Sequence, residues 1–346
     1  MTSAVVHTNP ALPAADFGDA RAEFEALLSG CAIYDLSARS KIVLTGADRV
    51  RWLNGMVTNN IRDLAVGHGV YAFLLNPQGH ILGDLYAYNR GESLMIESER
   101  SQSPKLLATF DHYIIMDDVE VNDVSEKLTA IGIAGPKARE VLRAVGFEIP
   151  QLEPLQLVDV AWQNVAVTVV RGDNASVKSY EMWLSPSHIR LLRDALTKAG
   201  ATLSGTTALE QLRIAAGIPR YGQDIHERDL PQETEQQRAV HFSKGCYIGQ
   251  EIVERIRSRG NVHRMFTGFE AQGPLPVVGT KIQADGKDVG EITSAASLPF
   301  AGGDRAVALG YIRREATTPG TKVQAGGTQL SVATLPFSGI FRHQNL

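Results

Sequence analysis

One short segment of the chain, KGCYIGQE at residues 244–251, brings a thiol, a cation and two glycines together. Cys246 is one of only two cysteines, and Lys244 lies just before it. Apolar residues recur at helical spacing directly after this segment, which predicts a helix that begins just beyond the thiol. Because a neighbouring cation and a helix N-terminus both stabilise a thiolate, we expect Cys246 to be reactive, with Lys244 favouring its charged form. The alternative is that Cys246 is a small buried hydrophobic residue.

The chain up to residue 260 mixes strand and helix patterns without a regular order. Strands are predicted at residues 41–45, 71–75, 81–88, 93–98, 128–133, 165–170 and 180–184. Helices are predicted at residues 20–28, 104–112, 137–145, 188–198 and 207–216, with another that begins at Ala47. Residues 76–79 have the composition of a turn, so the strands on either side should form a hairpin. This order favours an α+β layered fold over a doubly wound sheet.

The pattern changes after Arg264, where helical periodicity fades and short β-prone pieces lie between glycines. These pieces are residues 266–269, 281–282, 289–293, 306–312 and 330–333. Closely spaced short strands predict a small antiparallel β-barrel. We therefore expect two domains. One is an α+β unit of two intertwined subdomains at residues 1–260, which starts with a loose tail at 1–15, and the other is a C-terminal β-barrel domain at 265–346.

The composition of the chain narrows the function classes. The chain has 346 residues with 34 Lys plus Arg and 38 Asp plus Glu, a formal net charge of -4, which argues against a general nucleic-acid binder. The two cysteines and nine histidines have no spacing typical of a metal site, and neither a GxGxxG nor a P-loop motif is present. No apolar run is long enough to span a membrane and residues 1–15 lack a signal-peptide pattern, so we expect a cytoplasmic protein without a membrane partner.

Several motifs together resemble one family. Residues 244–251, followed by Arg255 and the stretch RGNVHR at 259–264, resemble the signature of the YgfZ-type folate-binding proteins. These are relatives of the aminomethyltransferase, or T-protein, of the glycine cleavage system. Further matches to that superfamily lie at residues 58–61 with 69–71, at 79–85 and at 209–219, so the resemblance covers the chain from about residue 30 to its end.

This resemblance implies a ring-like folate-binding unit with ferredoxin-like halves, followed by a C-terminal barrel. It implies a tetrahydrofolate pocket in the first unit and a role in keeping iron–sulfur enzymes active, with iron–sulfur client or assembly proteins as partners. By position, the match assigns the pocket to Tyr71, Asn76, Asp84, Tyr88 and Glu181. In T-proteins an acid at the position of Asp84 lies near the reacting folate nitrogen, which implies a general acid/base role for it.

The types of these residues suit a pteridine ring. Its flat face needs an aromatic or apolar wall, and its amino-pyrimidine edge donates two hydrogen bonds that Asp84 or Glu181 could accept. Each candidate also has a plainer interpretation. Asp84 follows a turn and could cap it, the two tyrosines could be half-buried core residues, and Glu181 could point outward from an alternating strand.

A basic run follows the thiol segment. Its members are Arg255, Arg257, Arg259, His263 and Arg264. The run could bind the glutamate tail of folate, or an acidic or RNA partner. For Arg257 we favour a solvated helix end, where basic residues complement the helix dipole.

Three departures from the T-protein pattern weigh against aminomethyl transfer from a lipoyl carrier. The paired acids of that pattern are Gly83 and Asp84 here, its R-x-E-A-G helix reads RIAAG at 213–217, and its Thr-Gly-Tyr loop is replaced by residues 172–179. We therefore expect a tetrahydrofolate-binding protein that supports iron–sulfur protein assembly or repair, with Cys246 as its reactive group. The alternatives are a folate-dependent aminomethyltransferase that uses Asp84 as acid/base, and a non-enzymatic folate-binding scaffold.

Overall fold

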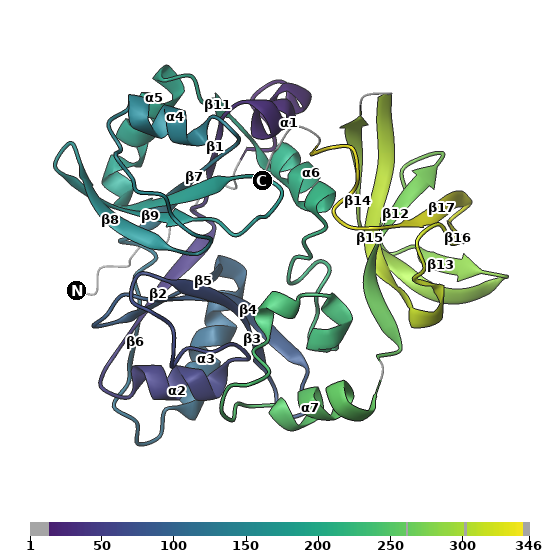
Figure 1. Ribbon diagram of the computed structural model, residues 1–346, viewed down its shortest axis with the longest axis horizontal. Coiled ribbons are helices and arrows are strands. Elements are labelled where there is room, and N and C mark those ends of the chain that lie inside the picture. Colours follow the sequence, from purple (N-terminus) through teal and green to yellow (C-terminus); the bar gives the residue numbers. More distant parts are fainter. Residues whose placement is uncertain (1–13, 261, 301–302, 342–346) are drawn as a thin grey trace, which may run out of the picture.

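The structure is a computed structural model that describes residues 14–260, 262–300 and 303–341. It consists of two sheets that face each other, helices on their outer faces, and a closed barrel to one side (Figure 1). Most of the predicted tail at residues 1–15 lies outside the described residues. Its last two residues, Ala14 and Ala15, accept hydrogen bonds from the backbone N–H groups of Thr206 and Thr207. In the part of the chain described, no helix is both long and apolar enough to cross a membrane.

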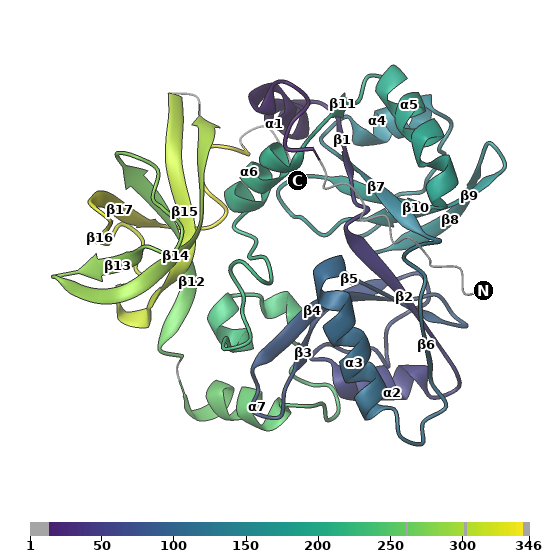
Figure 2. The same ribbon diagram turned by 180° about the vertical axis from the view of Figure 1, so that it is seen from behind.

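The first sheet has five strands in the order β3-β4-β5-β2-β6. Its strands are β2 (Arg39–Thr45), β3 (Gly69–Leu75), β4 (Ile81–Asn89), β5 (Leu94–Glu99) and β6 (Glu120–Asp123). β3 and β4 form the predicted hairpin, and the apolar side chains of the outer face pack against α2 (Arg49–Met56) and α3 (Ser103–Tyr113). Figure 2 shows α3 lying across this outer face. Strand alternation leaves polar and aromatic side chains on the inner face.

The second sheet has six strands in the order β11-β1-β7-β10-β9-β8. Its strands are β1 (Ala32–Asp35), β7 (Thr129–Ala134), β8 (Leu157–Trp162), β9 (Val165–Arg171), β10 (Ser179–Leu184) and β11 (Thr202–Leu203). Helices α4 (Ala138–Ala144) and α5 (Ile189–Lys198) cover its outer face. β1 belongs to this sheet although β2, the next strand in the chain, belongs to the other. The two sheets are therefore interleaved in sequence, which brings distant segments of the chain face to face.

The inner faces of the two sheets meet through a small apolar cluster built on Tyr88 of β4 and Trp183 of β10. Their rings pack edge to face with centroids 5.1 Å apart. Gly69 lies opposite Tyr88 on β3 and leaves room for its ring, because a Cβ at Gly69 would come within 2.3 Å of that ring. This contact fixes the spacing of the two inner faces, on which the candidate site lies.

The barrel is closed in the order β12-β15-β14-β13-β16-β17. Its strands are β12 (Arg264–Gln272), β13 (Lys281–Ala284), β14 (Lys287–Phe300), β15 (Gly303–Arg313), β16 (Lys322–Ala325) and β17 (Thr328–Ala333). The predicted α+β fold with a C-terminal antiparallel barrel is confirmed. Within the barrel, the prediction missed β16, a strand of four residues.

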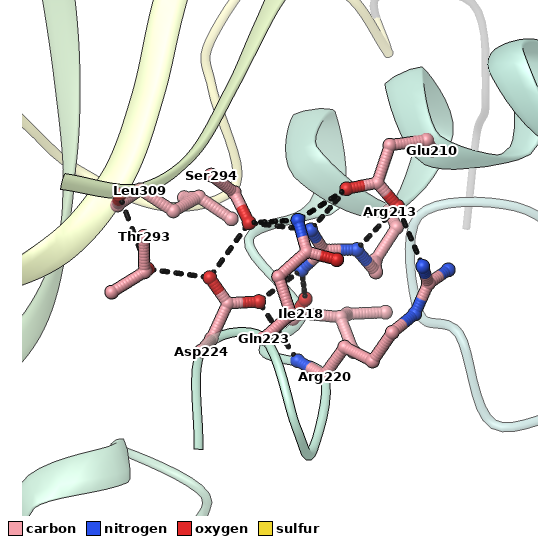
Figure 3. A network of polar contacts seen from close by, with 9 residues as sticks. All are labelled: Glu210, Arg213, Ile218, Arg220, Gln223, Asp224, Thr293, Ser294 and Leu309. Atoms are coloured by element: carbon pink, nitrogen blue, oxygen red, sulfur yellow. Dashed lines mark hydrogen bonds and ion pairs between the residues drawn. The ribbon is translucent and has the colours of Figure 1, made fainter. Parts of the chain in front are cut away.

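A polar network joins the barrel to α6 (Thr206–Ala216), a helix that packs against α1 (Ala20–Ser29) (Figure 3). We call Arg213, Asp224, Thr293 and Ser294 the junction network. All four of these residues are buried, although they come from α6, the loop after it and β14.

Asp224 lies at the centre of the junction network. Its Oδ1 accepts hydrogen bonds from the hydroxyls of Thr293 and Ser294 at 2.5 and 2.7 Å. Its Oδ2 accepts from the guanidinium of Arg213 at 2.6 Å and from the backbone N–H of Arg220 at 2.9 Å. Consecutive residues of a regular strand point to opposite faces, but an irregularity in β14 between Ile292 and Ser294 lets two consecutive hydroxyls reach one carboxylate.

Candidate functional site

Asp84 lies on β4 at the inner face of the five-stranded sheet, and both of its carboxylate oxygens are held. Oδ2 accepts a hydrogen bond from the Tyr71 hydroxyl at 2.6 Å, and Oδ1 accepts one from the Gln102 side chain at 2.7 Å. The backbone N–H of Asp84 donates to the same Gln102 side chain at 3.0 Å. Neighbouring side chains therefore orient this carboxylate, and it does not cap a turn. Gln102 was not predicted, because its pairing with β4 has no periodic signal in the sequence.

Tyrosines on β3 and β4 form an aromatic wall beside Asp84, made of Tyr71, Tyr86 and Tyr88. Tyr86 lies opposite Tyr71 in register with ring centroids 5.0 Å apart, and the Tyr88 ring follows at 6.4 Å from that of Tyr86. Burial and then the charge of Asp84 raise the pKa of Tyr71 well above its ordinary value. Tyr88 is enclosed at the contact between the sheets and is more deeply buried than the half-buried core residue of its plainer interpretation. Tyr86 was missed, although period-two alternation between Asp84 and Tyr88 places it on the same face.

A cation and an acid from distant parts of the chain cover the aromatic wall. The guanidinium carbon of Arg238 lies 4.4 Å from the centre of the Tyr71 ring, and Arg238 forms an ion pair with Asp173. The Tyr86 hydroxyl donates a hydrogen bond to Asp173 at 3.4 Å. Asp173 belongs to the loop at 172–179 that departs from the T-protein pattern, so this loop reaches the wall from the second sheet. Neither Arg238 nor Asp173 was predicted, because only the fold brings them together.

A second set of charged side chains lies between the sheets, and we call Arg39, Lys41, Glu97 and Glu181 the inter-sheet cluster. Lys41 on β2 is opposite Glu97 on β5, and both side chains are fully buried. Glu97 Oε1 accepts hydrogen bonds from Lys41 Nζ at 2.8 Å and from Arg39 Nε at 2.9 Å. Burial acts to raise the pKa of Glu97, but the charges of Arg39 and Lys41 outweigh it and hold the pKa below its ordinary value. Glu97 is therefore an ionised carboxylate with two cations on one oxygen.

Glu181 of β10 faces this cluster from the other sheet. Its Oε2 accepts a hydrogen bond from Trp183 Nε1 at 2.9 Å, and its carboxyl group lies close enough to Glu97 for the negative charge of Glu97 to act on it. Burial and the negative charge of Glu97 raise the pKa of Glu181. The plainer interpretation, in which Glu181 points outward from its strand, is therefore wrong. Glu97 Oε2 is buried, and no N–H or hydroxyl group of the described residues donates to it.

The contacts of Lys244 correct the role predicted for it beside the thiol. Its ammonium is buried and donates three hydrogen bonds, each of 2.6 Å, to the main-chain carbonyls of Asn54, Val57 and Asn59. These carbonyls lie at and after the end of α2, where helical partners run out and a cation is attracted. Burial and then the charge of Arg62 lower the pKa of Lys244 to about 7. Lys244 therefore anchors the thiol segment to the end of α2.

The two cysteines lie in opposite environments. Cys246 is exposed, so it is not the small buried hydrophobic residue of the plainer interpretation. Cys31 is buried, and burial raises its pKa to about 12. The helix predicted after the thiol is α7 (Gln250–Arg259), which begins after Gly249 in a left-handed backbone conformation with a φ of 80°. A side chain there would approach the Asn76 carbonyl to 2.6 Å, so glycine lets the segment pack closely against the hairpin tip.

Asn76 is used by the hairpin turn. It lies at the tip of the β3–β4 hairpin, where its side-chain oxygen accepts a hydrogen bond from the His80 backbone at 2.9 Å. Its own backbone N–H donates to the His80 carbonyl at 2.9 Å. The side chain thus closes the turn, whereas the prediction placed it in the pocket.

Two arginines of the basic run are paired within the molecule. Arg264 forms ion pairs with Asp229 at 2.5 Å and with Glu233 at 3.1 Å. Arg257 pairs with Glu254 at 2.7 Å on α7, which agrees with a solvated helix end. Within residues 14–260, 262–300 and 303–341, no group of three or more His, Cys, Asp or Glu side chains is placed to hold a metal ion.

Two known protein families match successive parts of the chain. The GCVT N-terminal domain matches residues 9–244, and the CAF17 C-terminal beta-barrel domain matches residues 263–337. The aminomethyltransferase of Rubrobacter xylanophilus is 28% identical over 298 residues, which cover 85% of this chain and 79% of that protein. A putative chloroplastic transferase of Arabidopsis thaliana is 25% identical over 307 residues, which cover 87% of this chain and 70% of that protein.

One solved structure shares the fold over nearly the whole chain. It is the glycine cleavage system aminomethyltransferase T from Bartonella henselae, which superposes with a TM-score of 0.82 at 23% sequence identity. The superposition covers 92% of this chain and 90% of that one. The likeness establishes a common architecture for the two interleaved sheets and the barrel.

Proposed function

The chain belongs to the family that shares the GCVT N-terminal domain, and on that premise we propose that it binds tetrahydrofolate between its two sheets and supports the assembly or repair of iron–sulfur proteins. The oriented carboxylate of Asp84 carries the first half of this proposal. The exposed thiol of Cys246 supports the second half.

The Asp84 carboxylate beside the aromatic wall fits a reduced folate. The partly exposed ring of Tyr86 offers a flat surface of the kind that a pterin packs against. Tyr71 and Gln102 hold the Asp84 carboxylate in one orientation, as a general acid or base that faces a nitrogen of the ligand requires. On the opposite sheet, Glu181 has the carboxyl group that a 2-amino-pyrimidine edge requires. Tetrahydrofolate, when bound, supplies the nitrogen that carries a one-carbon unit.

The thiol segment fits a role toward protein partners. KGCYIGQE resembles the YgfZ-type signature, and the Cys246 thiol is exposed. Lys244 ties the segment to α2, and Gly249 packs it against the β3–β4 hairpin. The thiol is therefore held at a fixed place on the surface of the folate-binding unit, where a client or assembly protein can reach it.

Calorimetric titration with tetrahydrofolate under anaerobic conditions tests the folate half. Wild-type protein should bind with micromolar affinity, and Asp84→Ala should weaken binding at least tenfold, which is about 1.4 kcal/mol. Asp111→Ala removes an exposed carboxylate on α3 and serves as the matched control, with unchanged affinity. Absence of binding by the wild-type protein would refute this half of the proposal.

Alkylation and complementation test the thiol half. Iodoacetamide should label Cys246 faster than Cys31, because Cys31 is buried with its pKa raised to about 12. In cells that lack the protein, Cys246→Ala should fail to restore iron–sulfur enzyme activity, whereas Cys31→Ala should restore it. Full restoration by a Cys246→Ala protein that still binds folate would favour a non-enzymatic folate-binding scaffold.

An aminomethyltransferase is the second candidate function. The observation that favours it is the similarity to proteins named aminomethyltransferase, at 28% identity over most of the chain. The replaced acids and the replaced loop at 172–179 weigh against it. Turnover of an aminomethyl–lipoyl carrier, lost in Asp84→Asn, would establish this activity. Folate binding without such turnover would favour the first proposal.

A further inference from the structure

The inter-sheet cluster has one buried oxygen that finds no donor in the described part of the chain. Glu97 Oε1 accepts hydrogen bonds from Arg39 and Lys41, whereas no N–H or hydroxyl group of the described residues donates to Oε2. A charged oxygen enclosed in protein without a hydrogen bond is costly. The acid that faces this carboxylate from the other sheet is Glu181 of β10. A proton on Glu181 would therefore satisfy the unpaired oxygen of Glu97.

Glu181 is the acid that can carry this proton. Its Oε2 accepts the hydrogen bond of Trp183, which leaves its other oxygen to hold a proton and donate it. Glu97 does not take the proton itself, because Arg39 and Lys41 both favour its ionised form. Two neighbouring carboxyl groups resist double ionisation, which agrees with the raised pKa of Glu181.

Resting on the proposed function, we infer that Glu97 and Glu181 share one proton in the free protein, and that Glu181 releases it when the pterin edge binds. The O–H bond of Glu181 breaks, its proton passes to the solvent, and the ligand's two N–H donors take its place on the carboxylate. No electron is transferred. Arg39 and Lys41 then face two carboxylates, so the charges in the cluster balance. Glu97 is a positioning residue, because it sets the protonation state of the ligand-binding acid.

The other titratable groups around Glu181 do not supply this proton. They are Arg39 and Lys41 on β2, Glu97 on β5, Tyr88 on β4 and Tyr34 on β1. Burial raises the pKa of both tyrosines far above neutrality, so they stay uncharged. The Tyr34 ring fills the space beside Gly132, which is the neighbour of Glu181 in the sheet. In this set, Glu181 is the group whose raised pKa brings its titration toward neutral pH.

Calorimetry in two buffers tests the inference on the wild-type protein. Tetrahydrofolate is titrated anaerobically at one weakly acidic pH in phosphate and in imidazole, which differ in their enthalpy of ionisation. Release of about one proton per bound folate makes the two measured enthalpies differ by the difference between those ionisation enthalpies. The affinity should also weaken as the pH falls, by up to about tenfold per pH unit. Binding with equal enthalpies in both buffers would overturn the shared proton, whereas no binding in either buffer would refute the proposed function on which it rests.

Two variants locate the proton. Glu97→Gln replaces the charged partner with an amide that can donate to Glu181, so proton release should fall to near zero. Glu99→Gln is the matched control, since Glu99 pairs with Arg39 at 3.4 Å at the more exposed edge of the cluster, and it should release about one proton. In infrared difference spectra of the wild-type protein, the band of a protonated carboxyl should disappear when folate binds. The Glu97→Gln protein should show no such change. Undiminished proton release by a folded Glu97→Gln protein would contradict the inference.

Discussion

The junction network and the inter-sheet cluster are both buried sets of charged side chains, and they differ in completeness. Each oxygen of Asp224 in the junction network accepts two hydrogen bonds. In the inter-sheet cluster, Glu97 has two donors on one oxygen, whereas no N–H or hydroxyl group of the residues that the structure describes donates to the other. A complete network is expected to hold structure, because every member loses a partner when one is removed. In the incomplete inter-sheet cluster, Glu181 can gain or lose a proton.

The largest effect should come from Asp224→Asn. Both oxygens of Asp224 face donors, so the new amide N–H group would point at a guanidinium or at two hydroxyls, and Arg213 would lose a buried counter-charge. We expect the free energy of unfolding to fall by about 3–5 kcal/mol in urea denaturation. Asp304→Asn changes an exposed barrel carboxylate and should cost little. A fall of less than about 1 kcal/mol for Asp224→Asn would contradict the structural role of the junction network.

A smaller effect is expected from Ser294→Ala. The Ser294 hydroxyl donates to Asp224 at 2.7 Å and accepts from Arg213 at 2.7 Å and from Gln223 at 2.9 Å, so its loss leaves three groups short of one partner each. The free energy of unfolding should fall by about 1–3 kcal/mol, measured by the same denaturation. Folate affinity should stay unchanged, because the junction network lies outside the space between the sheets. A loss of affinity with unchanged stability would show that the network serves the ligand.

The smallest effect on stability at low pH should come from Glu181→Gln, and this effect should depend on pH. An acid with a raised pKa in the folded state binds more protons there than in the unfolded chain, so wild-type stability declines as the pH rises from about 4.3 through that raised pKa. The variant lacks this decline. Its free energy of unfolding should lie within about 0.5 kcal/mol of the wild-type value at low pH. As the pH rises, it should become larger than the wild-type value. Parallel curves of stability against pH would contradict a raised pKa for Glu181.

Most helices and strands were predictable, because their apolar periodicity is local. The contacts of the site were not. Tyr86 could have been found by extending the alternation of β4, but Lys41 and Glu97 meet only when β2 pairs with β5, and Glu181 joins them from the other sheet. Lys244 lies close to Cys246 in sequence, yet the unpaired carbonyls at the end of α2 determine where its ammonium goes.

The placement of β1 has a consequence for synthesis on the ribosome. The neighbours of β1 in its sheet are β7 and β11, whereas all strands of the other sheet, from β2 to β6, are made before β7 begins at Thr129. The five-stranded sheet can therefore assemble while β1 waits beside it with both edges unpaired. A strand with open edges is a template for wrong pairing. Because β1 has only four residues, it offers few backbone groups for wrong pairing while its edges are open during translation.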